Sequence, residues 1–173
     1  MLNLILLSFD PTRITDLIVG LAFIASAMWL LSSDSKKLQL ATNKKNFIKK
    51  VIEWGLTNIN YPGLTSKNRS VFVEVQYYKH KRKLGEFVPS HNKIKVYVNS
   101  HADVKEMVNT AIHELIHHYQ FSVDKKHFQT NYSKLLNQLS YKKHPMEIEA
   151  REMASQYTDS CIKALEKQGL IKF

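Results

Sequence analysis

The residues best suited to chemistry are two histidines and a glutamate in the segment His113-Glu114-Leu115-Ile116-His117. On a helix, side chains four positions apart lie on the same face, with Cβ atoms about 5–6 Å apart. Two imidazoles at that spacing can bind one Zn²⁺ ion at about 2.0–2.1 Å. The spacing therefore predicts His113 and His117 as metal ligands. The alternative interpretation of such a pair is a polar stripe on an amphipathic helix.

Glu114 is rotated away from the face that carries the two histidines, so we do not expect it to bind the ion directly. It can still reach a water molecule on the metal, because zinc lowers the pKa of such a water to about 7 and a neighbouring carboxylate can accept its proton. The pattern predicts Glu114 as the general base in zinc-dependent hydrolysis of a peptide bond.

Catalytic zinc sites use three protein ligands and keep one position open. The metzincin class would require Gly at position 120 and His at position 123, where this chain has Gln120 and Val123, so that class is excluded. The best candidate for the third ligand is Glu147, in the first turn of the last predicted helix. A glutamate there is also favoured by the helix dipole alone, or by pairing with Arg151. Four further candidates stay open: Glu149, His144, Asp124 and His127.

The elements that must position these residues follow from hydrophobic periodicity. Apolar spacing predicts helices over 46–56, 100–121 and 146–168, with a short helix near 132–139 after a polar stretch at 122–130. Ser100 and Asp103 resemble a capping box for the second of these helices. Alternating apolar residues predict strands at 71–78 and around 94–98, separated by a basic loop at 79–83. This order predicts an α+β fold.

The segment HELIH followed by a helix carrying E-x-x-A resembles the gluzincin branch of zinc metallopeptidases. It is similar in particular to small minimal zincins of the ImmA/IrrE type, and the similarity covers residues 93–157. In that group the third ligand is a glutamate opening an E-x-x-A-[N]-x-x-A helix, which matches Glu147, Ala150 and Ala154. Arg151 replaces the usual Asn, and Ile116 replaces the familiar Gly. The resemblance implies a small sheet packed on the active-site helix, with residues 93–99 as a substrate-binding edge strand.

Several other residues are candidates for supporting roles. Tyr132, Tyr141 or Tyr157 could stabilise an oxyanion. His118 is expected beside the site, for example facing Glu114, rather than on the metal. Cys161 is the only cysteine, which excludes an intramolecular disulfide and a cysteine-based zinc site.

The chain is basic, with 25 Lys and Arg against 15 Asp and Glu in 173 residues and a formal net charge of +10. Such a surface favours anionic partners such as nucleic acid or anionic lipid. Two alternatives to a simple peptidase stay open. One is a DNA-associated protease of the SprT-like kind, and the other is a non-catalytic binding or structural protein with a degenerate metal site.

The segment 17–33 contains no charged residue. Its 17 residues would span about 25 Å as a helix, slightly less than a bilayer core, and tilt or local thinning can close that gap. We expect one transmembrane helix within an N-terminal segment 1–35, followed by the peptidase domain 36–173. Lysines after the segment predict a cytoplasmic domain by the positive-inside rule. A signal peptide or a buried helix is the alternative.

Overall fold

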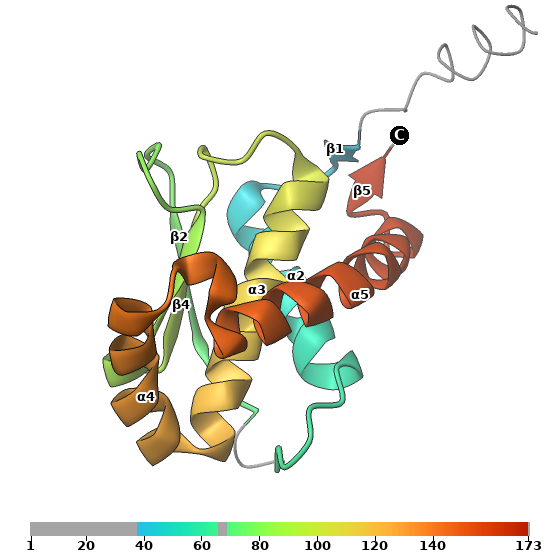
Figure 1. Ribbon diagram of the computed structural model, residues 1–173. Coiled ribbons are helices and arrows are strands. Elements are labelled where there is room, and N and C mark those ends of the chain that lie inside the picture. Colours follow the sequence, from blue (N-terminus) through green and yellow to red (C-terminus); the bar gives the residue numbers. More distant parts are fainter. Residues whose placement is uncertain (1–37, 66–68, 173) are drawn as a thin grey trace, which may run out of the picture. The chain divides into compact units, whose positions relative to one another are not determined.

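The computed structural model describes residues 38–65 and 69–172, and these form an α+β fold. The predicted transmembrane helix and the boundary after residue 35 lie outside the described residues and stay predictions. Within the described ranges, no helix has the length and apolarity needed to cross a bilayer. The elements follow in the order β1 (Gln39–Leu40), α2 (Lys44–Asn58), β2 (Phe72–Gln76), β3 (Gly85–Val88), η2 (Pro89–His91), β4 (Lys93–Tyr97), α3 (Val104–Val123), α4 (Lys125–Gln138), η3 (Tyr141–Lys143), α5 (Pro145–Lys167) and β5 (Ile171–Lys172) (Figure 1).

The larger sheet has the strand order β2-β4-β3. Its central strand, β4, is parallel to β2 and antiparallel to β3. The short helix η2 and the left-handed Asn92 (φ 45°) reverse the chain between β3 and β4. A second, two-stranded sheet joins β1 to β5.

The prediction that residues 93–99 lie at the sheet edge is wrong, because β4 has a strand on each side. The charged alternate face that suggested an edge is explained by ion pairs with both neighbouring strands. Lys93 lies 2.6 Å from Glu74 of β2, and Lys95 lies 3.4 Å from Glu86 of β3. The edge strand next to α3 is β3, which follows the basic loop and was not predicted as a strand.

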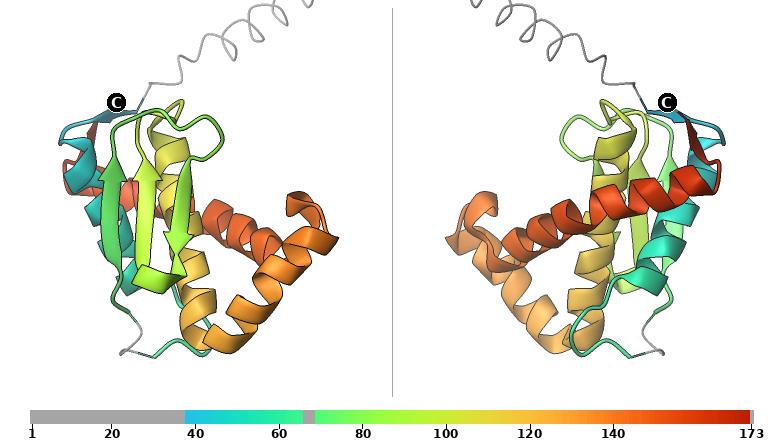
Figure 2. Two further views of the ribbon diagram at one scale, coloured as in Figure 1. Left: turned by 90° about the vertical axis from the view of Figure 1, so that its left-hand side faces the viewer. Right: turned by 90° about the vertical axis from the view of Figure 1, so that its right-hand side faces the viewer.

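The core surrounds α3, which lies between the sheet on one side and α5 on the other (Figure 2). Its apolar stripe is fully buried and contacts both layers. The buried residues on this stripe include Val108, Ala111, Ile112, Leu115, Ile116 and Tyr119. On α5, the small Ala150 and Ala154 are also buried, which lets the two helices approach closely. This packing holds the segment His113–His117 against the start of α5.

The helix ends are set by side-chain caps. Asp103 is the N-cap of α3, and its carboxylate accepts a hydrogen bond of 2.8 Å from the backbone N–H of Glu106. The predicted start at Ser100 is therefore early, since the Ser100 hydroxyl instead accepts from His80 N–H. Asp124 ends α3 and also caps α4 by accepting from His127 N–H at 2.8 Å. This capping turn makes α4 begin within the stretch predicted to be irregular.

Candidate metal centre

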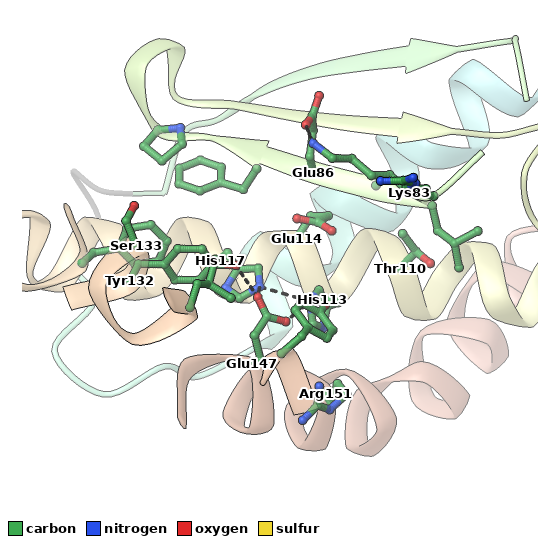
Figure 3. Close-up of a pocket in the computed structure, with 18 of the residues that line it drawn as sticks. Lys83, Glu86, Thr110, His113, Glu114, His117, Tyr132, Ser133, Glu147 and Arg151 are labelled. Atoms are coloured by element: carbon green, nitrogen blue, oxygen red, sulfur yellow. Dashed lines mark hydrogen bonds and ion pairs between the residues drawn. The ribbon is translucent and has the colours of Figure 1, made fainter. Parts of the chain in front are cut away.

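The imidazoles of His113 and His117 leave the same face of α3 and point toward the N-terminal turn of α5 (Figure 3). Their Nε2 atoms lie 3.0 Å apart, and the two rings are nearly perpendicular. His117 is buried, and His113 is half-buried at the pocket wall. The helical spacing thus produces the convergence of two nitrogen donors that the sequence predicts.

Glu147 adds a third donor from α5. Its two carboxylate oxygens lie 3.2 Å from His117 Nε2 and 3.3 Å from His113 Nε2. Pro145 opens α5 at a position where a missing N–H costs nothing, which places Glu147 in the first turn. The structure therefore brings together the three residues predicted as ligands.

The three donors fit a small divalent cation. In a tetrahedral site with bonds of about 2.0–2.1 Å, neighbouring ligand atoms lie about 3.3 Å apart. The two Nε2 atoms lie 3.0 Å apart, each lies within 3.3 Å of one Glu147 oxygen, and one donor atom from each residue lies within 4.8 Å of the others. Glu147 is only 1% exposed, and its Oε2 accepts no hydrogen bond from the described residues. A buried carboxylate oxygen without a donor requires a compensating charge. Two imidazoles and one carboxylate form a donor set that suits zinc.

Electrostatics hold Glu147 in its charged form. Burial alone would raise the pKa of Glu147, but the adjacent His113 and His117 rings outweigh burial and keep the pKa well below its usual value. The Tyr132 hydroxyl also donates to Oε1 of Glu147. Burial, and then this carboxylate, raises the pKa of Tyr132, so the phenol keeps the proton that it donates.

A chain of hydrogen bonds supports His117 from behind. The Nδ1 atom of His117 lies 2.8 Å from Oε1 of Gln120. The Gln120 amide nitrogen donates to the carboxylate of Glu149 at 2.8 Å, and Glu149 also accepts from the Tyr61 hydroxyl at 3.0 Å. Because the Gln120 nitrogen faces two acceptors, Glu149 and the Met146 carbonyl, its oxygen faces His117. Nδ1 of His117 therefore donates, which leaves the Nε2 lone pair for a metal.

Glu114 lies on the opposite side of α3 from this chain, between the helix and strand β3. Its carboxylate accepts a hydrogen bond from the backbone N–H of Phe87. Burial raises the pKa of Glu114, against the attraction of His117 and His113. A raised pKa suits a group that first accepts a proton and then returns it.

The alternative third ligands have other roles. Glu149 accepts a hydrogen bond from the Gln120 amide. His144 is buried, with its Nε2 atom 3.1 Å from the Tyr132 carbonyl oxygen. Asp124 caps α4, and His127 is exposed on that helix. Among the described residues, the one group of three or more His, Cys, Asp or Glu side chains with converging donors is His113, His117 and Glu147.

The other predicted supporting residues divide into two groups. Tyr132 and Tyr141 line the pocket, whereas Tyr157 packs against Trp54 with a centroid distance of 6.4 Å. Tyr157 is therefore too remote from the site to stabilise an oxyanion. His118 is buried against Phe87, and Cys161 is a buried free thiol.

A pocket of about 870 Å³ opens over the three donors. Its walls come from β3, the loop before it, α3, α4 and the first turns of α5. Gly85 on β3 is required by this closeness, because a Cβ there would lie 2.8 Å from Thr110 Cγ2 and 2.9 Å from Glu114 Cγ. Two parts of the site were not predicted from the sequence, strand β3 and Gln120. Strand β3 could not be recognised because it is short and follows a charged run. The only sequence signal for Gln120 is its position three residues after His117.

Comparison of the chain with models of known protein families, with curated proteins and with solved structures found no match.

Proposed function

We propose that this protein is a zinc-dependent metallopeptidase of the minimal zincin type. The observation that carries the proposal is the convergence of His113, His117 and Glu147, with the buried carboxylate of Glu114 on the adjacent helix face. A bound zinc ion would polarise the scissile carbonyl and acidify a water molecule. His113 and His117 from α3 and Glu147 from α5 would hold it.

Glu114 supplies the proton transfers. Its carboxylate lies at the pocket wall, where it can take a proton from the attacking water and later deliver it to the leaving amine. The Phe87 N–H fixes the carboxylate relative to β3. A polar side chain at this position would have little reason to be buried if the site were merely structural.

Strand β3 offers a place for the substrate backbone. Within the described residues it pairs only with β4, so no strand covers the backbone groups of its other edge, although the Phe87 N–H already donates to Glu114. An extended peptide can add to such an edge by β-augmentation. We therefore assign to β3 the substrate-binding role that the resemblance assigned to residues 93–99.

The first test measures zinc content and peptide cleavage in the full chain. We expect near-stoichiometric zinc, cleavage of a mixed peptide library and loss of cleavage on chelation. Glu114→Gln should keep the zinc and lower kcat by about 10²–10⁴-fold, the usual contribution of a positioned general base.

The controls separate an enzyme from a structural metal site. His113→Ala should lose zinc, whereas His127→Ala, which removes an exposed histidine on α4, should keep both zinc and activity. A zinc-loaded wild-type chain that cleaves no peptide would contradict the proposal and favour a non-catalytic metal protein.

A further inference from the structure

The two ends of the pocket differ in chemistry. Strand β3 runs alongside α3 in the same direction, since Gly85 lies beside Thr110 and Phe87 lies beside Phe121. Helix α5 runs the other way along α3, since the Met146 carbonyl contacts Gln120 and Thr158 contacts Asn109. One end of the pocket therefore lies over the first half of α3, and the other end lies over its second half.

Three cationic side chains lie at the first end, which we call the basic end: Arg82, Lys83 and Arg151. Figure 3 shows Lys83 and Arg151 toward the His113 side of the site, away from Tyr132, with Lys83 on the β3 side of α3 and Arg151 on α5. Lys83 is neutralised by Glu86 at 2.5 Å. Within the part of the chain that the structure describes, Arg82 and Arg151 form no ion pair with a carboxylate.

Arg151 is held in position for a ligand. Its Nη2 donates to the Lys142 carbonyl at 2.8 Å, and its guanidinium lies 5.6 Å from the centroid of the Tyr141 ring. A guanidinium has five N–H donors in a rigid plane, so most of them stay available. This planar fork matches a carboxylate, which it can bind with two parallel hydrogen bonds.

The charge balance of the pocket points the same way. Two carboxylates face it, those of Glu114 and Glu147, and they balance Arg82 and Arg151. Lys83 and Glu86 neutralise each other, and the Glu86 carboxylate points away from the site (Figure 3). A divalent metal ion therefore leaves the loaded pocket with two positive charges. In a half-enclosed pocket this excess favours an anionic group on the substrate.

The second end of the pocket is apolar and aromatic, and we call it the apolar end. Phe87 and Phe128 line it with centroids 6.3 Å apart, and Tyr132 stacks on Phe128 at 4.9 Å. Phe121 packs on both phenylalanines at 5.6 and 5.7 Å but does not line the pocket. Leu136 reaches the same wall and is partly exposed. Exposed apolar surface beside a polar centre is typical of a specificity pocket.

We infer that the enzyme prefers peptides with an Asp or Glu side chain on one side of the scissile bond and a large apolar side chain on the other. This inference rests on the proposed peptidase function. Arg151 binds the acidic side chain at the basic end, with Arg82 adding charge. The apolar end receives the apolar side chain.

The test compares matched peptides cleaved by the zinc-loaded full chain. Cleavage sites in a mixed library are mapped by mass spectrometry, and a preferred peptide is then made with Glu or with Gln at the acidic position. We expect wild-type kcat/KM to be about tenfold higher for the Glu peptide, since a charge-assisted hydrogen bond is roughly twice as strong as a neutral one.

Three variants identify the residue responsible. Arg151→Gln should bring the Glu-to-Gln ratio close to one, and Arg82→Gln should lower it by a smaller factor. Arg151→Glu should shift the preference toward a peptide with Lys at that position. Lys163→Gln removes the same charge from an exposed position on α5 outside the pocket and should leave the ratio unchanged. Zinc content shows whether each variant is folded.

A second measurement does not depend on turnover. Fluorescently labelled versions of the Glu and Gln peptides are titrated with the zinc-loaded Glu114→Gln variant. The Glu peptide should have the lower Kd, and adding Arg151→Gln should make the two Kd values equal. If the wild type cleaves the library but treats the two peptides equally, the inference is wrong and the peptidase function stands. If it cleaves nothing, both are wrong.

Discussion

Gln120 links the metal site to residues that do not reach the three donors. Its amide joins the His117 ring to the Glu149 carboxylate, which Tyr61 also holds. Residues that fix a histidine ligand in this way typically contribute a factor of 10–100 to metal affinity. The roles of Glu147 and Glu149 should therefore differ in kind, although the two residues are near neighbours on α5.

We predict that Glu147→Ala abolishes near-stoichiometric zinc binding, whereas Glu149→Ala and Gln120→Ala weaken it by about 10–100-fold. The measurement is a competition titration with a chromophoric zinc chelator. Glu152→Ala, which changes an exposed glutamate on the same helix, is the control and should bind zinc like the wild type. Loss of zinc in Glu149→Ala but not in Glu147→Ala would contradict the assignment of the third ligand.

The sequence predicted the two histidine donors because helical spacing alone brings His113 and His117 together. The spacing of Glu147 in a separate helix also fitted a known pattern. It could not predict the chain from His117 to Tyr61, because Tyr61 and Glu149 are 88 positions apart and meet only through packing. Glu149 was therefore an open candidate for the third metal ligand, whereas in the structure its carboxylate binds the Gln120 amide.

Strand β3 is the element on which the geometry of the candidate site most depends. It was not predicted because four residues after a basic run show no alternation long enough to indicate a strand. The edge position was assigned instead to β4, whose lysines pair with carboxylates on both neighbouring strands. Helices α2, α3 and α5 were predicted more accurately, since their periodicity extends over 15 to 23 residues.

The contact between β3 and α3 leads to a second prediction. Gly85→Ala should lower kcat/KM by tenfold or more while zinc content stays unchanged, because the new methyl group meets Thr110 and Glu114 within 3 Å. The strand must then move away from α3, which breaks the hydrogen bond from the Phe87 N–H to the Glu114 carboxylate. Steady-state kinetics and elemental analysis measure the two effects.

Gly55→Ala is the contrasting variant. A Cβ at Gly55 would lie 2.4 Å from Leu115 Cδ2 in the core between α2 and α3. Overpacking costs about 1–3 kcal/mol, which exceeds the gain of about 1 kcal/mol in helix propensity. This variant should lose thermal stability but keep its turnover per folded molecule. An active Gly85→Ala enzyme would show that β3 does not position Glu114.

The outer face of the sheet leads to a prediction about pH. Glu86 accepts hydrogen bonds from Lys83 and Tyr97, at 2.5 and 2.8 Å. Burial opposes the charged form of Glu86, but these partners prevail and lower its pKa to about 2. A lowered pKa stabilises the fold above the unfolded value near 4.3, and this contribution is lost as the pH falls toward 2.

Urea denaturation at pH 7, 5 and 3 measures this effect. The free energy of unfolding of the wild type should fall more steeply below pH 5 than that of Glu86→Gln, which lacks the titrating group. Glu53→Gln removes an exposed glutamate that pairs with Lys50 on α2 and should follow the wild-type curve. Parallel curves for wild type and Glu86→Gln would contradict the prediction.

The proposed metal site joins two helices that are far apart in the sequence. His113 and His117 lie in the middle of α3, and Glu147 lies at the start of α5. The unfolded chain cannot hold these donors together, so zinc would bind the folded state preferentially. Metal binding should therefore stabilise the entire fold.

We predict that the melting temperature rises with free zinc. At a concentration 100 times the Kd, binding adds about 2.7 kcal/mol, which for a domain of this size corresponds to a rise of about 5–11 °C. Glu114→Gln should show the same rise because it keeps all three donors, and Glu147→Ala should show none. Thermal melts of the full chain at several zinc concentrations measure the effect. If zinc binds stoichiometrically without raising the melting temperature, the ion does not join α3 to α5, and the three donors do not act as one site.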